Sequence, residues 1–280
     1  MKVLVIGLGS MGKRRIRCLH KLGIKNIHGY DTRVDRVREA VDLYKINKFV
    51  EMRALESSSF DLVIISTPPD QHKEYISLAI SVQTPFFVEA SVISDGLQEI
   101  CDNLSTLGLK CYPSTTLRFH PAIKEIRKLL AEGEIGKVLH TTLHSGQYLP
   151  DWHSYEHVSD FYVSNKKTGG GREIVPFELT WFVEIFGMPK TVTGMFRKTR
   201  NIEGAGDIDD VYVFLMDYGT QLSTFSVDVV SRVATRLLLV NGELGQLRWS
   251  WEENCVRVYL AKEKKWQKIS FNVEESADLY

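Results

Sequence analysis

The chain has 280 residues, of which 44% are hydrophobic and 25% are charged, a composition typical of globular proteins with about two domains. Its 35 Lys and Arg residues balance its 35 Asp and Glu residues, so we expect no nucleic-acid partner and no binding to anionic membranes. No apolar run approaches the roughly 18 residues that span a bilayer, and the four cysteines have neither CxxC nor zinc spacing. We therefore expect a reduced, cytoplasmic protein with no metal site.

Short apolar runs alternate with helical patterns in the first part of the chain. The predicted strands are residues 2–6, 27–30, 61–65, 85–88 and 109–112. One predicted helix ends at residue 22, and two others cover residues 71–82 and 96–107. Strands that alternate with helices in this way are typical of βαβ units in a parallel sheet. The sequence therefore predicts an α/β domain with a doubly wound parallel sheet over residues 1–117.

The pattern changes from residue 118 onward. Pro121 begins an amphipathic helix, and a series of short strands follows with hairpin signals at Asp217-Tyr218-Gly219 and Asn241-Gly242. Phe225 and Val227 alternate with polar residues, as in a sheet with one face in water. Residues 118–280 are therefore predicted to form an α+β domain with a mainly antiparallel, open sheet.

A glycine motif, Gly7-x-Gly9-x-x-Gly12, lies between the first strand and the first helix. In dinucleotide-binding folds such glycines make a tight turn, admit a pyrophosphate and let helix and strand pack closely. The helix N-terminus then presents free N–H groups to the phosphates. Asp31 ends the second strand, where a carboxylate can bind the adenosine ribose hydroxyls. Glycines that merely turned the chain would not explain Asp31, so the motif predicts a Rossmann nucleotide site.

The same residues predict which nucleotide is bound. Asp31 favours NAD, because a carboxylate repels the 2′-phosphate of NADP. Arg33 could soften this preference, or it could be a solvated arginine at a helix start. The run Lys13-Arg14-Arg15 could contact phosphate, but a solvated helix face is favoured. We predict NAD as the cofactor, with NADP possible.

Further motifs follow in a specific order. They are Ser66-Thr67-Pro68-Pro69-Asp70-Gln71-His72, the strand-end Glu89, Arg118-Phe119-His120-Pro121, Gly133-Glu134-Ile135-Gly136-Lys137-Val138 and Gly169-Gly170-Gly171. With them the chain resembles the Gfo/Idh/MocA oxidoreductase family over nearly its whole length. The resemblance implies an N-terminal Rossmann domain, a C-terminal domain whose sheet often forms a dimer face, and NAD(P) between the two. It also implies a sugar, cyclitol or nucleotide-linked sugar as substrate, and residues 146–152 resemble members from surface-polysaccharide and nonulosonate synthesis.

The resemblance further implies a set of cofactor contacts. These are Gly7, Leu8, Gly9, Ser10, Met11, Gly12, Asp31, Thr32, Arg33, Ser66, Thr67, Pro68, Pro69, His72, Glu89 and Ala90. Without the resemblance, His72 would be interpreted as an exposed residue in the first turn of its helix. The resemblance also implies a homo-oligomer formed through the C-terminal sheet, and residues 274–280 look like the start of a helix that family members continue.

Two departures from the family pattern concern proton transfer. The family usually carries Glu-Lys-Pro where this chain has Glu89-Ala90-Ser91, so the lysine position is Ala90. The family histidine that follows the glycine run falls at Phe177, or at Leu179 under another gap placement. Oxidation of an alcohol needs a group that accepts the hydroxyl proton. Neither of the usual groups is present.

Glu178 is one candidate for the missing group. It lies on a helix predicted to start near Pro176, in the middle of an apolar arc that includes Phe177 and Trp181. A buried carboxylate is costly unless it is paired or holds a proton, and the second case suits a general acid or base. The alternative is a structural glutamate bonded to a backbone amide or to an arginine such as Arg172.

The segment after residue 151, which we expect to be a loop facing the cleft, offers further candidates. Because histidine titrates near neutral pH, His153 could accept the proton, although a surface histidine is the commoner case. Arg118 could bind an anionic substrate group or pair with an acidic residue. Trp152 and Tyr155 could stack on a sugar or nicotinamide ring, or pack in the core. The predicted substrate contacts are Arg118, Trp152, Tyr155 and Arg172.

Two functions remain open at this point. The first is an NAD(P)-dependent sugar or nucleotide-sugar oxidoreductase with a non-standard proton acceptor from residues 150–180. The second is a redox-inactive protein that keeps NAD as a structural or sensing ligand. A third route, oxidation followed by elimination or hydrolysis with return of the hydride, would use the same site without net redox chemistry.

Overall fold

The computed structural model describes residues 1–56, 58–90, 92–153 and 156–271. The chain divides into two compact units, Met1–Ser114 and Thr115–Tyr280, with the division close to the predicted boundary after residue 117. Within the described ranges, no helix has the length and apolar character needed to cross a membrane. The helix start predicted at residues 274–280 lies outside the described residues.

The N-terminal unit contains a six-stranded parallel sheet. Its strands are β1 (Lys2–Ile6), β2 (Asn26–Tyr30), β3 (Asn47–Lys48), β4 (Leu62–Ile65), β5 (Phe86–Val88) and β6 (Cys111–Pro113), in the order β3-β2-β1-β4-β5-β6. All five predicted strands are present, with ends moved by at most two residues. The short edge strand β3 was not predicted, because two polar residues give no apolar signal.

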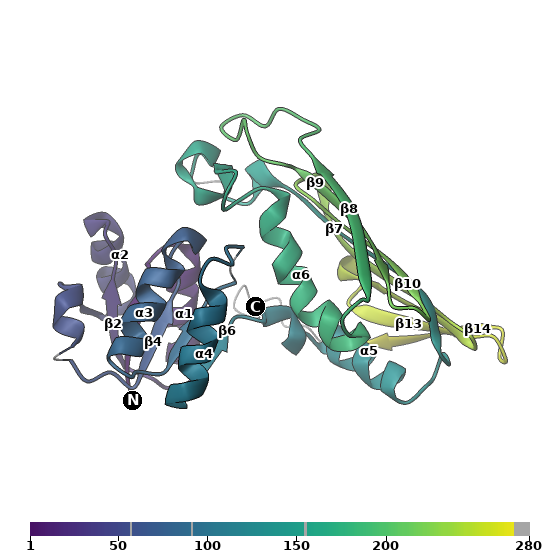
Figure 1. Ribbon diagram of the computed structural model, residues 1–280, viewed down its shortest axis with the longest axis horizontal. Helices are drawn as coiled ribbons and strands as arrows, with labels where there is room; N and C mark the ends of the chain where they lie inside the picture. Colours follow the sequence, from purple (N-terminus) through teal and green to yellow (C-terminus); the bar gives the residue numbers. More distant parts are fainter. Residues whose placement is uncertain (57, 91, 154–155, 272–280) are drawn as a thin grey trace. The chain divides into compact units, whose positions relative to one another are not determined.

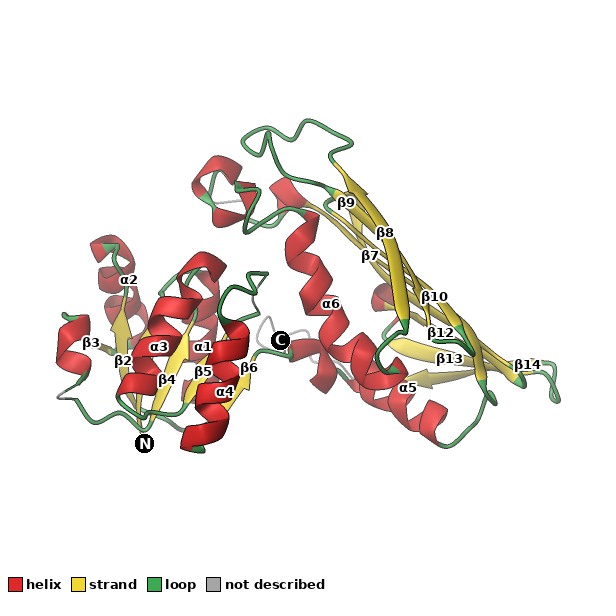
Figure 2. Cartoon of the chain, in the orientation of Figure 1, coloured by secondary structure: helices red, strands yellow, loops and turns green. Residues whose placement is uncertain are grey.

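Helices cover both faces of this sheet (Figure 2). They are α1 (Ser10–Lys21), α2 (Val34–Tyr44), α3 (His72–Ser81) and α4 (Leu97–Leu107), with short 3₁₀ turns at Met52–Leu55 and Pro69–Gln71. Alternate residues of β1 enter two different hydrophobic clusters, Val3 and Val5 on one face and Leu4 and Ile6 on the other. Burial on both faces explains the continuous apolar run of β1. The predicted doubly wound α/β domain is confirmed.

The C-terminal unit contains an eight-stranded sheet in the order β14-β13-β12-β11-β7-β10-β9-β8. The strands are β7 (Val138–Tyr148), β8 (Thr191–Arg197), β9 (Val211–Asp217), β10 (Leu222–Asp228), β11 (Val230–Gly242), β12 (Gly245–Ser250), β13 (Cys255–Leu260) and β14 (Lys265–Ser270). Only the β7–β10 pairing is parallel among these strands, so the predicted mainly antiparallel sheet is confirmed. The β9–β10 hairpin turns at Gly219 as predicted, whereas the β11–β12 hairpin turns at residues 243–244, after the predicted Asn241-Gly242.

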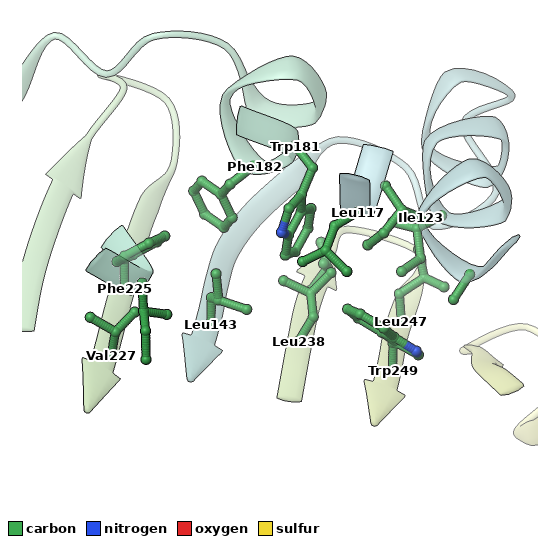
Figure 3. Packing of buried hydrophobic residues seen from close by; sticks show 14 of the residues in the cluster. Leu117, Ile123, Leu143, Trp181, Phe182, Phe225, Val227, Leu238, Leu247 and Trp249 are labelled. Carbon is green, nitrogen blue, oxygen red and sulfur yellow. The ribbon is translucent and has the colours of Figure 1, made fainter. Parts of the chain in front are cut away.

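Helices α5 (Pro121–Ala131) and α6 (Gly171–Phe186) lie on one face of this sheet (Figure 1). Figure 3 shows Trp181 and Phe182 of α6 directed into the core that this face forms with Phe225, Leu238 and Trp249. Short 3₁₀ turns precede and connect these elements at Thr116–Phe119, Leu149–Asp151, Val158–Asp160, Tyr162–Ser164 and Trp251–Glu253.

The start of α6 differs from the prediction. The helix begins at Gly171, not near Pro176, so that Pro176 lies inside it. The prediction relied on the preference of proline for the first turn of a helix. Here the Gly171 N–H donates to the Asp209 carbonyl at 3.0 Å, and this contact with a distant segment fixes the earlier start. As a result, Glu173 lies in the first turn of α6.

Candidate functional site

The glycine turn packs tightly against the start of α1. Gly7 has φ +87°, and its N–H donates to the Tyr30 carbonyl at the end of β2 at 2.8 Å. A Cβ at position 12 would lie 1.8 Å from the Gly7 carbonyl oxygen. Helix and turn therefore approach so closely that position 12 accepts only glycine, as the motif predicted.

The N-terminus of α1 has room for a phosphate group. Gly9 is its N-cap, no described side chain caps it, and its first turn has no acidic residue. A Cβ at position 9 would meet only the end of the Arg36 side chain, whose Nη1 would lie 3.5 Å away. Open N–H groups at a helix start bind anions well. The backbone here therefore fits a pyrophosphate.

Asp31 is bonded to the glycine turn. Its Oδ2 accepts a hydrogen bond from the Leu8 N–H at 2.7 Å, and its Oδ1 accepts one from the Arg33 N–H at 2.8 Å. The Arg33 side chain is directed to Asp35, with Nη2 2.6 Å from Oδ2, and this bond lowers the pKa of Asp35 to about 2. Arg36, in the first turn of α2, is the arginine beside the glycine turn. The sequence analysis considered a helix start at Arg33 but gave no extent for this helix, so it missed Arg36.

A buried ion pair lies beyond the glycine turn, where β5 and β6 end. Arg15 donates from Nε to Glu89 Oε1 at 2.6 Å and from Nη2 to Glu89 Oε2 at 2.8 Å, and its Nη2 lies 3.3 Å from Ser114 Oγ. The two paired side chains are only 13% and 12% exposed. The interpretation of Arg15 as part of a solvated helix face is therefore wrong. Its guanidinium instead joins α1 to two strand ends and fixes the Glu89 carboxylate.

His72 is buried, so the interpretation of this residue as exposed is also wrong. Its Nε2 lies 2.9 Å from the Thr67 carbonyl, and burial lowers the pKa of its ring. His72 thus holds the turn that follows β4. The other predicted cofactor contacts of this unit, Ser10, Met11, Thr32, Ser66, Thr67, Pro68 and Pro69, lie on the glycine turn and on the ends of β2 and β4, at the same carboxyl edge of the sheet.

The positions that the resemblance assigns to the family lysine and histidine hold residues without acid–base capacity. Ala90 follows Glu89 after β5. Phe177 and Leu179 both pack against the hydrophobic core of the C-terminal unit. Any proton acceptor for alcohol oxidation must therefore come from other side chains.

Glu178 is fully buried and fully paired. Its Oε1 accepts from Ser145 Oγ at 2.9 Å and from Arg236 Nη2 at 2.7 Å, and its Oε2 accepts from Trp181 Nε1 at 2.7 Å. The arginine is Arg236 of β11, not Arg172. These contacts are those of the structural alternative, in which the carboxylate fixes α6 to the sheet.

Glu173 has a different environment on the same helix. Its Oε1 accepts a short hydrogen bond from the Tyr162 hydroxyl, while its Oε2 is shielded from solvent and has no partner among the described residues. Burial raises the pKa of Glu173 to about 7. The sequence analysis missed this residue because the helix was predicted to start after it.

The other predicted substrate contacts are spread over the C-terminal unit. His153 stacks on Phe161 with ring centroids 4.1 Å apart, and its Nδ1 lies 3.5 Å from Glu156 Oε2. Arg118 Nε lies 2.9 Å from Glu184 Oε2 of α6. Trp152 is half-buried and Arg172 is exposed, while Tyr155 lies outside the described residues. In the described ranges, no group of His, Cys, Asp or Glu residues could hold a metal ion.

The parallel sheet, the glycine turn and the open start of α1 are the features of a dinucleotide-binding Rossmann domain, which is followed here by a second domain with a mainly antiparallel sheet. The family description "Oxidoreductase family, NAD-binding Rossmann fold" matches residues 1–109, and "GFO/IDH/MocA C-terminal domain" matches residues 123–248. The chain belongs to the Gfo/Idh/MocA family of oxidoreductases. A comparison with curated proteins finds no match.

Solved structures share this fold at low sequence identity. A levoglucosan dehydrogenase in complex with NADH and levoglucosan is 15% identical with TM-score 0.85, covering 97% of this chain and 80% of its own. An oxidoreductase from Agrobacterium radiobacter in complex with NAD⁺, L-tartaric acid and magnesium is 16% identical with TM-score 0.83. The match covers 99% of this chain and 82% of that oxidoreductase chain. Biliverdin reductase from Synechocystis sp. PCC 6803, with biliverdin and NADP⁺, is 14% identical with TM-score 0.79, covering 99% and 86%.

Proposed function

We propose that this protein is an NAD(P)-dependent oxidoreductase that acts on a sugar or a nucleotide-sugar. The observation that carries the proposal is the bonded unit of the glycine turn, the open start of α1 and Asp31, which fits a dinucleotide. When bound, NAD(P) supplies a nicotinamide ring that accepts or donates a hydride. The backbone N–H groups from Gly9 onward hold the diphosphate, and Asp31 accepts hydrogen bonds from the adenosine ribose.

A polyhydroxylated substrate has support from the similar structures. Two of those proteins are in complex with levoglucosan or L-sorbose and with L-tartaric acid, respectively. The resemblance of residues 146–152 to polysaccharide-pathway members extends the proposal to the sugars of surface polysaccharides. The biliverdin reductase has the same fold with a different ligand, so the substrate has to be identified by assay.

The C-terminal unit supplies the remaining roles in this proposal. Arg118, Trp152, Tyr155 and Arg172 are proposed substrate contacts, and the proton acceptor comes from residues 150–180. Glu178 and His153 are the two acceptors that the sequence favours. The four hydrogen bonds of Glu178 to Ser145, Trp181 and Arg236 weigh against it, since a proton acceptor needs a free oxygen.

Formation of NADH from NAD⁺ in the presence of candidate polyols tests the function. Absorbance of the reduced nicotinamide, followed over a panel of sugars, sugar acids, cyclitols and nucleotide-sugars, should rise with at least one of them. The reverse assay starts from NADH or NADPH and the corresponding keto compounds. The proposal fails if the protein binds NADH but no compound in either direction gives turnover.

That failure would favour the second candidate, a redox-inactive protein that keeps NAD as a structural or sensing ligand. The observation that favours it is Ala90 in place of the family lysine, together with Phe177 and Leu179 at the histidine position. One result distinguishes the two functions. A protein with either function binds NADH, but only the oxidoreductase oxidises or reduces a sugar.

We also propose a homo-oligomer that forms through the open face of the C-terminal sheet. Met195 of β8 and Leu215 of β9 are 71% and 60% exposed and lie on the face opposite α6. Exposed apolar side chains on neighbouring strands are typical of a protein interface. Light scattering after size exclusion should therefore report a dimer or larger, and Leu215→Lys should lower the mass toward that of one chain.

The proposed location is the cytoplasm. In the described ranges, which include all four cysteines, no cysteine forms a disulfide bond. Proteins of oxidising compartments commonly pair their cysteines, so cysteines without disulfides favour a reducing compartment. Fractionation of cells that express the protein, with antibody detection, tests this location.

A further inference from the structure

Two arginines lie against one aromatic ring at the end of β7. The guanidinium carbon of Arg232 lies 3.7 Å from the centre of the Tyr148 ring, and that of Arg200 lies 5.5 Å from the same point. Both arginines are exposed, and neither has an acidic partner among the described residues. Two positive charges that share a ring and no counter-charge repel each other. The arrangement therefore favours an anion that contacts both.

A buried aspartate fixes the backbone of Arg200. Asp210 is fully buried, and its Oδ2 accepts from the Arg200 N–H at 2.9 Å. Its Oδ1 accepts from the N–H and the hydroxyl of Thr199, at 2.7 and 3.0 Å. Backbone and hydroxyl donors thus satisfy this carboxylate. The Arg200 backbone is held in place, while its guanidinium keeps an uncompensated charge.

A second buried aspartate fixes the segment that carries Arg232. The register of β11 against β7 shifts between Val230 and Thr235, and Arg232 lies in the residues that this shift leaves out of the pairing. Asp228 Oδ1 accepts from the N–H groups of Val230 and Ser231 at 3.0 and 2.8 Å, and its Oδ2 accepts from Ser231 Oγ at 3.0 Å. Such bulges often redirect a side chain beside a functional site. Here the freed arginine lies on Tyr148.

The segments that these aspartates hold are also bonded to each other. Val229 donates its N–H to the Asp210 carbonyl at 2.9 Å, and Leu149 donates its N–H to the Val229 carbonyl at 3.1 Å. All of these residues belong to the C-terminal unit. Arg200 and Arg232, called the arginine pair below, are therefore positioned together with Tyr148 by this unit alone.

We propose that the arginine pair binds the diphosphate group of the substrate, so that a nucleotide-linked sugar, not a free sugar, is the substrate class of this protein. The inference rests on the proposed function, because it names the substrate of that reaction. A guanidinium that stacks on a ring keeps its N–H edge free, and this edge binds phosphate oxygens in bidentate fashion. A diphosphate offers a charged group to each arginine, whereas an uncharged sugar compensates neither.

The sugar part of such a substrate has a candidate contact close by. Tyr148 and Trp152 flank the short 3₁₀ turn Leu149–Asp151, and the Trp152 N–H donates to the Leu149 carbonyl at 3.1 Å. Trp152 is one of the proposed substrate contacts. A ligand with its diphosphate on the arginine pair can therefore place its sugar beside this turn.

Calorimetric titration with inorganic pyrophosphate tests the site on the full chain saturated with NADH, which keeps the glycine turn filled. We expect saturable binding to wild type, and affinities lower by about tenfold or more in Arg200→Gln and in Arg232→Gln. Arg232→Lys should also bind more weakly, since an ammonium keeps the charge but loses the planar fork. Arg257→Gln is the matched control and should bind as wild type, because this exposed arginine lies on β13, with β12 and β11 between it and β7.

Two further readouts distinguish this site from a general effect of charge. Tyr148→Phe keeps the ring and should bind pyrophosphate within about twofold of wild type, whereas Tyr148→Leu should lose about threefold or more. With UDP-glucose or another nucleotide-sugar that the panel identifies, Arg200→Gln and Arg232→Gln should raise KM by about tenfold and change kcat by less than about threefold. A remote diphosphate is bound equally in the ground state and the transition state, so its loss affects KM.

The outcomes separate the inference from the function on which it rests. NADH-saturated wild type that binds L-tartrate but neither pyrophosphate nor a nucleotide-sugar overturns the inference alone, and so does turnover of free sugars with unchanged KM in the arginine variants. Equal losses in Arg257→Gln also overturn it. If wild type binds no NADH, the proposed function fails, and pyrophosphate titration of the ligand-free protein and its variants still decides about the arginine pair. If one arginine variant does not fold, the other and Tyr148→Leu decide.

Discussion

Asp31 and Leu8 are joined by a hydrogen bond of 2.7 Å, from the Leu8 N–H to Asp31 Oδ2, which connects the end of β2 to the glycine turn. The bond fixes the acidic side chain beside the turn before a nucleotide arrives. Such preorganisation lowers the entropy lost on binding. The acid and the glycines therefore act as one unit, although 23 residues of sequence separate Leu8 from Asp31.

Asp31→Asn should change the nucleotide preference. The amide keeps the size of the side chain but removes the charge that binds the ribose hydroxyls and repels a 2′-phosphate. We expect the Kd for NADH to rise by about tenfold or more and the Kd for NADPH to rise less or to fall. Quenching of protein fluorescence by each nucleotide measures both constants. Asp102→Asn, on the exposed side of α4, serves as the control, and equal losses for both nucleotides would contradict the assignment of Asp31.

Gly12→Ala and Gly9→Ala should separate folding from binding. A Cβ at position 12 would collide with the Gly7 carbonyl, so we expect this variant to lose about 2 kcal/mol of unfolding free energy. A Cβ at position 9 meets only a movable arginine end, and Gly9 has φ −70°, which alanine adopts easily. Gly9→Ala should keep its stability within about 0.5 kcal/mol and lose nucleotide binding. Urea unfolding and NADH titration check the pair, and full NADH affinity in Gly9→Ala would place the phosphates elsewhere.

Arg236→Met should destabilise the C-terminal unit strongly. It leaves the fully buried Glu178 carboxylate without its cation, which typically costs about 3–5 kcal/mol. Adding Glu178→Gln should restore part of the loss, because the uncompensated charge is then gone. The exposed pair of Arg257 and Glu253 gives the matched control, and Arg257→Met should cost less than about 1 kcal/mol. Chemical denaturation measures all four proteins, and an Arg236→Met variant as stable as wild type would remove the structural role of Glu178.

His120 should make the protein less stable in acid. Its Nδ1 accepts from the Ala122 N–H at the start of α5, and burial together with the charge of Arg236 lowers the pKa of His120 to about 4. Because the unfolded chain takes up this proton at a higher pH, stability falls as the pH drops from about 6.5 to about 4. The loss should be on the order of 1–2 kcal/mol once partial exposure is considered.

His120→Asn keeps a capping side chain and removes the titration. As the pH drops from about 6.5 to about 4, wild type should therefore lose more unfolding free energy than His120→Asn does. Parallel pH profiles for wild type and His120→Asn would contradict the interpretation.

The sequence predicts the N-terminal unit closely because its signals are local. Buried parallel strands are short apolar runs, and the role of Gly7, Gly9 and Gly12 follows from their spacing. A helix start at Arg33 was considered, but the extent of α2 was not predicted, and the position of Arg36 was missed with it. The pairing of Arg15 with Glu89 was missed for another reason. Only the fold brings a helix and a strand end 74 residues apart into contact.

The sequence predicts less of the C-terminal unit, because long-range contacts decide its details. The burial of Glu178 follows from the apolar arc of its helix, but its partner Arg236 is 58 residues away on β11. Pro176 indicated a helix start, whereas the contact of Gly171 with Asp209 sets it five residues earlier and brings Glu173 to Tyr162.

Calorimetric titration of the folded, ligand-stripped protein with NADH, and separately with NADPH, tests most directly whether this chain binds a dinucleotide at the glycine turn. We predict saturable heat with about one nucleotide per chain, tighter for NADH than for NADPH, and no heat in Gly9→Ala. Folded wild-type protein that gives no heat with either nucleotide would contradict the account.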